Sequence, residues 1–427
     1  MNRLYFIGIG GIGVSALAQY FKDQGAAVSG SDRVVSPVTE LLEKKSIAVL
    51  IGQKADNVPQ DAEIIVYSDA VPEDNPERVR AKELDIPQLS YFGMLGKVSE
   101  GKKAVAVAGT HGKTTTTGML AKILSDGETS PTAIIGSIVK DFGSNYLHGD
   151  SEVFVIEACE YRDHLLELAP TVLVITNLEW DHTDWFPSLA ALQETFHKAI
   201  ERVPASGYIV TDPHNKNIAP LLASAKAQVI DYTKETAYEL RVPGEFNQMN
   251  ARAAAAAARA VAPAITNDSI ATSLAQFHGT WRRFEYKGKS ANGAEVYDDY
   301  AHHPTAIKAT LAALRAKTKG KIFIAFHPHL YSRTRDLLEE FATSFQDADQ
   351  VAIAPIYAAR EVDDGTISSE LLAKRIKTHG VSVVALDSFY AITKFLSAAT
   401  AGDVIMTMGA GDIYKVADAL IKNKRPR

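Results

Sequence analysis

The sequence predicts a multidomain α/β protein built from three α/β units in succession. Short apolar runs typical of buried parallel strands recur along the chain, and each precedes a glycine-rich or polar turn and a helical pattern. Two of these turns, Gly8–Gly13 and Gly109–Thr114, have glycines at the spacing of nucleotide-binding loops. The chain of 427 residues is also too long for one ordinary domain.

The composition excludes several classes of protein. A formal net charge of −6 and the lack of a long basic run exclude a protein that coats nucleic acid. No apolar run approaches the roughly 18 residues that cross a bilayer, and the N-terminus has no signal-peptide pattern. The single cysteine, Cys159, cannot form an internal disulfide, which fits a reducing compartment. We therefore expect a cytoplasmic protein with no nucleic-acid or membrane partner, and the sequence does not indicate its oligomeric state.

The N-terminal region has the pattern of a dinucleotide-binding fold. A buried strand, Leu4–Ile9, leads into G-x-G-x-x-G at Gly8–Gly13, and Asp32 follows at about the distance where an acid binds a ribose hydroxyl. Strands are expected near Leu4, Val28, Val49 and Ile64. Because these form only one mononucleotide-binding half, we predict one nucleotide-sized ligand that carries a diphosphate. The alternatives are an NAD enzyme and glycines that serve helix–strand packing alone. We interpret Tyr91–Glu100 as a linker to the next domain.

A second nucleotide loop organises the middle of the chain. The apolar strand Ala104–Ala108 leads into G-T-H-G-K-T at Gly109–Thr114 and then into a helix. Backbone N–H groups at the start of that helix face an anion, Lys113 adds a positive charge, and Thr114 offers a hydroxyl to Mg²⁺. The chain departs from the strict phosphate-loop pattern at Val107, where the pattern has glycine.

Polar side chains follow two later strands of this region. Val153–Ile156 ends at Glu157, and Thr171–Thr176 is followed by a polar run that ends at His182. The carboxyl ends of parallel strands lie at one edge of a sheet, which is where ligands bind. We therefore predict that Glu157 and His182 hold a metal ion beside the phosphate loop.

Two polar pairs further along the chain leave alternatives open. Asn247 and Asn250 lie near the start of an alanine-rich helix, where they either cap the helix or contact an adenine edge. Arg282 and Arg283 lie at the join to the third unit, where they form either a solvated surface pair or a phosphate clamp.

The third unit carries a cluster of polar residues on one loop. After the strand Glu295–Tyr297, the residues of Asp298–His303 lead into a helix that begins at Pro304. Such crowding is unusual for a purely structural turn. Arg333 lies at the mouth of a later helix, where its planar guanidinium suits a carboxylate. Another glycine-rich loop, Gly409–Ile413, follows the last strand.

The motifs GIGGIG, GTHGKTTT, EACEYR, DDYAHHPT, YSRT and MGAGDI together resemble the Mur ligase family, from Ile7 to about Ile413. The resemblance implies an N-terminal Rossmann-like domain that binds UDP (1–96), a central P-loop domain with a mainly parallel sheet that binds ATP (97–282), and a C-terminal Rossmann-like domain (283–427). It implies that ATP and Mg²⁺ drive the joining of L-alanine to the carboxylate of UDP-N-acetylmuramate, through an acyl phosphate, for peptidoglycan synthesis.

The resemblance also assigns roles to residues. The implied ATP site comprises Gly109, Thr110, His111, Gly112, Lys113, Thr114, Thr115, Asn247, Asn250, Arg283 and Asp299. The implied UDP-substrate site comprises Gly10, Gly11, Ile12, Gly13 and Asp32, and the implied alanine site comprises Tyr300, His302 and Arg333. The implied metal ligands are Thr114, Glu157 and His182. The implied catalytic residues are Lys113, Glu157, His182, Asp299 and His302, of which His182 and His302 are candidates to accept the amine proton.

Two positions depart from the family pattern. Phe246 stands where many relatives have histidine, so a phenyl ring replaces an imidazole on the adenine side of the implied ATP site. Leu330 replaces an arginine that some relatives use together with the equivalent of Arg333, so the chain has one arginine for the amino-acid carboxylate and its selectivity can differ. The alternative functions are a ligase that recycles a tripeptide onto UDP-N-acetylmuramate and, more distantly, an NAD-dependent oxidoreductase.

Overall fold

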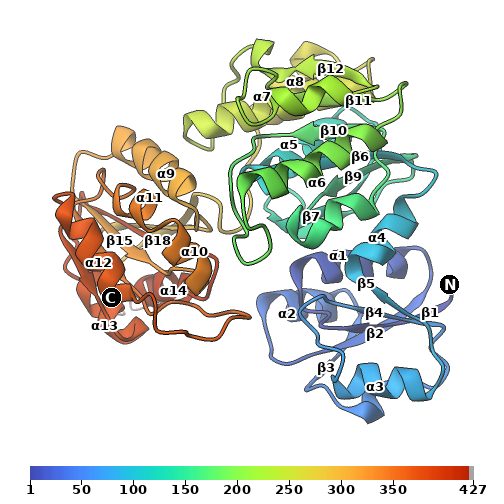
Figure 1. Cartoon of the computed structure of the whole chain (residues 1–427), viewed down its shortest axis with the longest axis horizontal. Coiled ribbons are helices and arrows are strands. Elements are labelled where there is room, and N and C mark those ends of the chain that lie inside the picture. The colour runs from blue at the N-terminus through green and yellow to red at the C-terminus, as the bar shows by residue number, and fades with distance from the viewer. Residues whose placement is uncertain (423–427) are drawn as a thin grey trace. The chain divides into compact units, whose positions relative to one another are not determined.

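The computed structural model describes residues 1–422 and divides them into two compact units (Figure 1). Unit 1 comprises Met1–Leu178, Gln193–Glu239 and Asn250–His278. Unit 2 comprises Glu179–Leu192, Leu240–Met249 and the chain from Gly279 onward. Unit 1 contains two β-sheets and unit 2 contains a third. Each of the three α/β regions that the sequence predicts therefore has its own sheet. No helix among residues 1–422 is long and apolar enough to cross a membrane.

The N-terminal sheet has five parallel strands in the order β3-β2-β1-β4-β5. The strands are β1 (Arg3–Ile7), β2 (Ala27–Asp32), β3 (Ala48–Ile51), β4 (Ile64–Tyr67) and β5 (Gln88–Ser90), and the helices between them are α1 (Ile12–Asp23), α2 (Pro37–Lys44) and α3 (Pro76–Glu83). The strand order reverses at β1, which places Gly8–Gly13 at the switch point where open α/β sheets bind ligands. The sheet is one mononucleotide-binding half with one strand, β5, more than the sequence indicated.

The predicted linker is helical: Tyr91–Ser99 forms helix α4, between the last strand of the N-terminal sheet and the first strand of the central sheet. Ser90 caps it by accepting a hydrogen bond from the N–H of Gly93, 3.0 Å away. A Cβ added at Gly96 would lie 2.4 Å from the carbonyl oxygen of Glu167, so α4 packs directly on the segment that follows β9. Its two glycines lower helix propensity, and this packing outweighs that preference.

The central sheet has seven strands in the order β12-β11-β10-β6-β9-β7-β8, parallel except for the β7–β8 hairpin. The strands are β6 (Lys103–Ala108), β7 (Thr132–Val139), β8 (Ser144–Leu147), β9 (Val153–Glu157), β10 (Val172–Ile175), β11 (Tyr208–Thr211) and β12 (Gln228–Asp231). The helices of this region are α5 (Lys113–Asp126), α6 (Leu189–Arg202), α7 (Glu245–Val261) and α8 (Asn267–Ala275). Because β6 lies between β10 and β9, the phosphate loop at its end is flanked by both polar strand ends.

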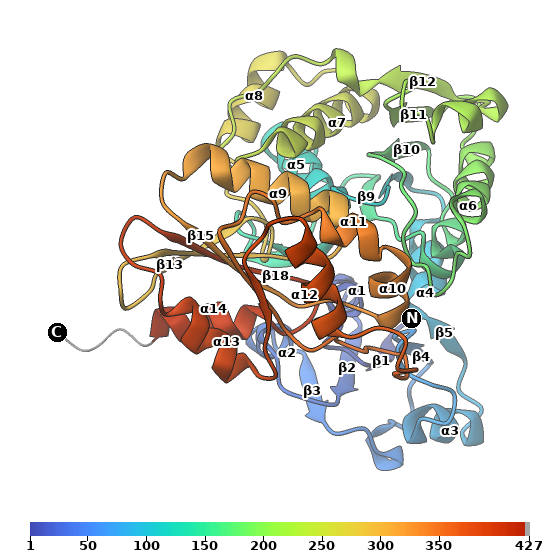
Figure 2. The same ribbon diagram turned by 60° about the vertical axis from the view of Figure 1, so that its left-hand side comes forward.

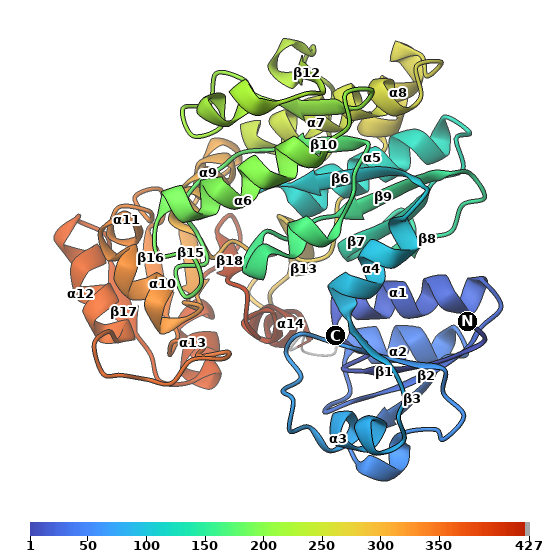
Figure 3. The same ribbon diagram turned by 45° about the vertical axis from the view of Figure 1, so that its right-hand side comes forward.

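Within unit 1, helix α1 packs against the β7–β8 hairpin (Figure 3). A buried polar network joins them. Asn145 accepts a hydrogen bond from Gln19 at 2.9 Å and donates to Ser15 at 2.8 Å, and Ser144 donates to Gln19 at 2.9 Å. Buried amides satisfied in this way fix one geometry, so the two sheets of unit 1 are held together by specific contacts.

The sheet of unit 2 has six strands in the order β13-β14-β18-β15-β16-β17, of which only β13 is antiparallel. The strands are β13 (Glu285–Lys289), β14 (Glu295–Asp299), β15 (Ile322–Phe326), β16 (Gln350–Ile353), β17 (Val383–Ala385) and β18 (Val404–Met408). The helices are α9 (Pro304–Lys317), α10 (Tyr331–Asp336), α11 (Leu338–Ala342), α12 (Ser369–Thr378), α13 (Phe389–Leu396) and α14 (Tyr414–Lys422).

Alternate residues of β15 point to opposite faces of this sheet, as the period of a strand requires. Ile322, Ile324 and Phe326 pack under α9, α11 and α12, whereas Phe323 and Ala325 pack under α13 and α14 (Figure 2). The sheet is therefore buried on both faces, which leaves its carboxyl edge for polar residues. Asp298 and Asp299 are the last residues of β14 and not part of a loop, which corrects the sequence-based expectation.

Candidate active site

The phosphate loop between β6 and α5 is braced by the end of β10. The N–H of His111 donates to Asn177 Oδ1 at 2.9 Å, and the N–H of Thr110 donates to the Asn177 carbonyl at 3.2 Å. Thr176 Oγ1 donates to the carbonyl of His111 at 2.6 Å. A Cβ added at Gly109, whose φ is +127°, would lie 2.2 Å from Thr176 Oγ1. The loop therefore needs glycine at this position both for its backbone conformation and for its close approach to β10.

Two carboxylates from the end of β9 engage adjacent residues at the start of α5. Thr114 Oγ1 donates to Glu157 Oε1 at 2.7 Å, and the second oxygen of Glu157 accepts from the N–H of Gly136 at 2.6 Å. Lys113 Nζ lies 3.0 Å from Glu160 Oε1. Burial alone would lower the pKa of Lys113, but the charge of Glu160 raises it above its ordinary value, so Lys113 is protonated.

The hydroxyl of Thr114 and the carboxylate of Glu157 are the hard oxygen ligands that Mg²⁺ prefers, and they are close enough to share one ion. His182, the third predicted ligand, lies in unit 2 with φ +52°, seven residues after the end of β10. Its participation stays a prediction.

Glycines of the N-terminal loop allow close approaches to two side chains. The N–H of Gly10 donates to Asp32 Oδ2 at 2.9 Å, and a Cβ at Gly10 would lie 2.8 Å from that oxygen. A Cβ at Gly13 would lie 2.6 Å from the ring of Tyr91. Gly11 and Ile12 complete the turn into α1. The backbone N–H groups at this helix start form a site suited to a diphosphate.

The two asparagines lie within α7, after its first residue Glu245, and both are buried. Asn250 Oδ1 accepts from Thr116 Oγ1 at 3.2 Å, and a Cβ at Gly112 would lie 2.2 Å from that oxygen. Asn250 therefore packs against the phosphate loop. In unit 2, Asn247 Nδ2 donates to the carbonyl of Pro243 at 2.7 Å.

Arg282 is neither a surface residue nor a free phosphate clamp, which corrects both sequence-based alternatives for it. It is 4% exposed, and its Nε donates to Asp298 Oδ2 at 2.8 Å. Its two terminal nitrogens donate to the carbonyls of Gly411 at 2.9 Å and Gly409 at 2.6 Å. Burial raises the pKa of Asp298 to about 6, against the opposing effects of Arg282 and Thr407. Arg282 thus ties the glycine-rich loop after β18 to the end of β14.

Asp299 is bound by backbone groups on both sides. Its oxygens accept from the N–H of Phe284 at 2.6 Å and of Ala301 at 2.7 Å. The guanidinium of Arg283, which is half-buried, lies 4.7 Å from the ring centroid of Tyr300, a cation–π distance. The predicted residues Arg283, Asp299 and Tyr300 therefore lie together at the carboxyl edge of the unit 2 sheet.

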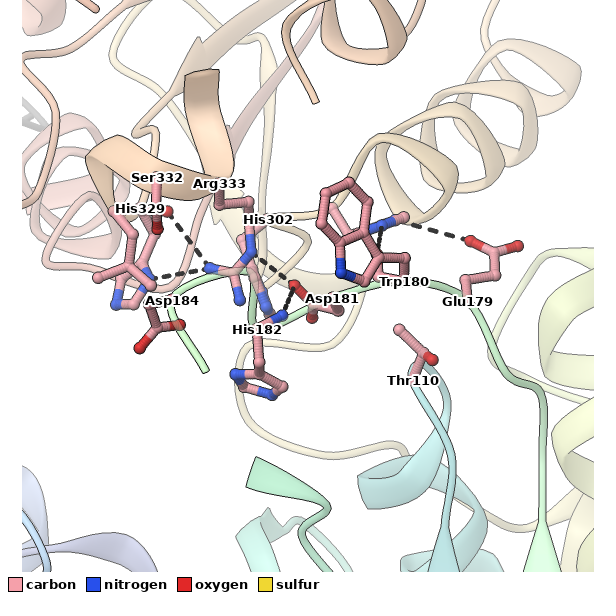
Figure 4. Close-up of polar contacts among 12 residues, drawn as sticks. Thr110, Glu179, Trp180, Asp181, His182, Asp184, His302, His329, Ser332 and Arg333 are labelled. Atoms are coloured by element: carbon pink, nitrogen blue, oxygen red, sulfur yellow. Dashed lines mark hydrogen bonds and ion pairs between the residues drawn. The ribbon is translucent and has the colours of Figure 1, made fainter. Parts of the chain in front are cut away.

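A buried charge cluster surrounds Arg333 (Figure 4). Its Nε donates to Asp181 Oδ1 at 2.7 Å, and its Nη1 lies 3.1 Å from His329 Nδ1. Arg333 is 1% exposed, and its Nη2 makes no hydrogen bond to any of residues 1–422. Leu330, at the position of the missing arginine, is fully buried with φ +73°. The side chain of Leu330 is therefore part of the core, and Arg333 is the arginine with a donor left for a carboxylate.

The same cluster keeps its histidines neutral. Burial and the positive charge of Arg333 lower the pKa of His302 well below its usual value. Burial would raise the pKa of Asp181, but Arg333 holds it well below its usual range. His302 Nδ1 lies 2.9 Å from the carbonyl oxygen of Tyr300, so Nδ1 carries the proton and Nε2 has a free lone pair. His302 can accept a hydrogen bond from an amine but is a weak base.

Three models of Mur ligase domains match the chain. They are the catalytic domain over residues 3–103, the middle domain over residues 107–240 and the glutamate ligase domain over residues 282–411. The chain belongs to the Mur ligase family. The UDP-N-acetylmuramate–L-alanine ligases of Acetivibrio thermocellus and Clostridium acetobutylicum are 39% and 37% identical to this Mur ligase, over 99% and 98% of its length and 96% and 97% of theirs.

Solved Mur ligase structures have the same fold. The UDP-N-acetylmuramate–alanine ligase of Thermotoga maritima superposes with a TM-score of 0.81 at 27% identity, over 99% of both chains. The UDP-N-acetylmuramate:L-alanyl-γ-D-glutamyl-meso-diaminopimelate ligase of Neisseria meningitides gives a TM-score of 0.59 at 29% identity, over 66% of this chain and 100% of that one. This comparison confirms the three-domain α/β architecture that the sequence predicted.

Several residues of the site escaped the sequence analysis. Glu160 of the EACEYR motif has no predicted role, and Thr176 and Asn177 are predicted only as part of a polar strand end. Tyr91 was assigned to a linker. Their positions in the sequence could have indicated them, because they follow β9, β10 and β5 at the carboxyl edges of the sheets, where ligands bind.

Proposed function

We propose that this Mur ligase joins L-alanine to the carboxylate of UDP-N-acetylmuramate in an ATP-dependent, ADP-forming reaction of peptidoglycan precursor synthesis. The observation that carries the proposal is the full-length similarity to ligases of that activity. The domain division 1–96, 97–282 and 283–427 belongs to the same proposal.

The chemistry requires a carboxylate to be activated before an amine attacks it. The muramyl carboxylate displaces ADP from the γ-phosphoryl group, and the acyl phosphate formed has phosphate as its leaving group. Phosphoryl transfer needs positioning and charge neutralisation, which the N–H groups of the loop and the protonated Lys113 supply. Bound Mg²⁺ would neutralise further phosphate charge, and Thr114 and Glu157 would hold it.

The amine side of the reaction uses the Arg333 cluster. Nη2 of Arg333 would bind the carboxylate of L-alanine, while Asp181 and His329 fix the plane of the guanidinium. The free Nε2 of His302 would accept a hydrogen bond from the amine and orient its lone pair toward the acyl phosphate. Because Arg333 alone would bind the amino-acid carboxylate, we expect glycine and L-serine to compete with L-alanine more strongly than in a site that has two arginines.

The test is release of inorganic phosphate by the purified protein with ATP–Mg²⁺ and UDP-N-acetylmuramate. We expect phosphate release with L-alanine, slower release with glycine or L-serine, and none without an amine. Preference for the tripeptide L-alanyl-γ-D-glutamyl-meso-diaminopimelate would show that the chain is the recycling ligase instead. Thermal stabilisation by NAD, but not by the UDP-sugar or by ATP–Mg²⁺, would support an oxidoreductase.

An Arg333→Lys variant tests the assignment of the alanine carboxylate. It keeps a positive charge beside Asp181 but loses the fork of donors, so we expect the KM for L-alanine to rise at least tenfold while the KM for ATP stays unchanged. Equal changes in both constants would contradict the assignment.

A further inference from the structure

Glu160 is a buried carboxylate beside the phosphate loop to which the reaction assigns no role. It lies three residues beyond the end of β9 and its side chain is 1% exposed. Its Oε1 lies 3.0 Å from Lys113 Nζ, whose side chain is 16% exposed. A carboxylate is rarely buried to this extent unless a positive charge is beside it. The ion pair is therefore a built feature of this loop.

The ammonium of Lys113 has all its donors engaged within the protein. Besides Glu160, it donates to the carbonyl of Gly109 and to the carbonyl of Thr110, the latter at 3.3 Å. An ammonium has three N–H groups, so three acceptors exhaust it. A phosphate oxygen can bind Lys113 only by replacing one of them. The ammonium is folded back onto its own loop, against the carbonyls of Gly109 and Thr110.

The two carboxylates after β9 thus act on neighbouring residues. Glu157 accepts from Thr114, the predicted metal ligand, and Glu160 accepts from Lys113, the predicted phosphate ligand. Both groups that would bind ATP–Mg²⁺ are held by side chains of one short segment. When Lys113 moves to a phosphate, its ion pair with Glu160 is lost.

We propose that Glu160 is a positioning residue that holds Lys113 back in the nucleotide-free protein, so that nucleotide phosphates must compete with this carboxylate for the ammonium. The proposal rests on the proposed ATP site. Glu160 lowers nucleotide affinity, and it stores the lysine in its charged, ordered form until phosphates arrive.

The test is calorimetric titration of the full-length protein with ATP in the presence of EDTA, so that metal ligation does not contribute. Glu160→Gln keeps an acceptor for Lys113 but removes the competing charge, and we expect it to bind ATP about tenfold more tightly than wild type. Glu167→Gln, an exposed position in the same segment, is the matched control and should bind as wild type does. A gain of affinity is an effect that loss of a merely structural contact would not produce.

Unchanged or weaker ATP binding by a folded Glu160→Gln protein would overturn the inference. Weaker binding only when Mg²⁺ is present would overturn it too, because it would make Glu160 a metal ligand. If Glu160→Gln does not fold, Glu160→Asp withdraws the carboxylate by one methylene and should also bind ATP more tightly. Failure of the wild type to bind ATP even when Mg²⁺ is present would refute the proposed function, whereas wild-type binding without a gain in the variants would refute this inference alone.

Discussion

Protonation of His329 should destabilise the protein, because this imidazole lies against an arginine. Its Nδ1 is 3.1 Å from Nη1 of Arg333, and a guanidinium has only donors, so Nδ1 must be the acceptor. A proton on Nδ1 would place two donors and two positive charges against each other. Burial and the charge of Arg333 accordingly lower the pKa of His329 from 6.5 to about 3.

The sign and size of the effect follow from linkage. The folded pKa lies below the unfolded value, so the stability from neutral His329 is fully present above pH 6.5 and is lost as the pH falls toward 3. At pH 5 the unfolded chain has bound this proton and the folded protein has not, which costs about 2 kcal/mol relative to pH 7.5. Replacing His329 with Asn keeps an acceptor near the position of Nδ1 and removes the titration.

Two measurements check this prediction. Urea unfolding followed by circular dichroism at pH 7.5 and 5.0 should show a loss of stability on acidification that is about 2 kcal/mol smaller for His329→Asn than for wild type. Imidazole NMR signals, with His329 assigned by its absence from the variant, should show no titration of this residue between pH 7.5 and 5. Titration of His329 near pH 6.5 in the folded wild type would refute the reasoning.

Three other substitutions test the loops around the site. Gly109→Ala places a Cβ 2.2 Å from a threonine oxygen and should abolish ATP binding by calorimetry, whereas Gly101→Ala, also at positive φ but with nothing within 4 Å, should bind as wild type does. Arg282→Met leaves the buried carboxylate of Asp298 without its ion-pair partner and should lower the free energy of unfolding by about 3–5 kcal/mol. The control Lys415→Met removes an exposed ion pair and should change this free energy by less than about 1 kcal/mol. Equal losses of stability for the two variants in urea unfolding would contradict the prediction. Thr114→Val should lower kcat with ATP–Mg²⁺ at least a hundredfold and leave ATP affinity in EDTA nearly unchanged, and a loss of both would argue against a metal ligand.

The sequence by itself determined the elements and the chemistry of the loops. Apolar runs, glycine spacing and helix starts are local properties. The expected strands Leu4–Ile9, Ala104–Ala108 and Val153–Ile156 therefore agree to within two residues at each end with β1, β6 and β9. The motifs sufficed to indicate the family. Thr114 and Glu157, 43 positions apart in the chain, were expected at one sheet edge because parallel strands β6 and β9 end there.

Tertiary structure alone decided which polar groups are already engaged. Arg282 and Arg283 are adjacent in sequence, yet the first is buried against Asp298 and two loop carbonyls and the second is half-buried over Tyr300. Nothing local distinguishes them, because the partner of Arg282 comes from β14 and its carbonyls from the loop after β18. The ion pair between Lys113 and Glu160 likewise joins residues from two different strand ends, so the local sequence does not reveal it. Burial and ion pairing set the charge state of each group, and both depend on residues brought together from distant parts of the chain.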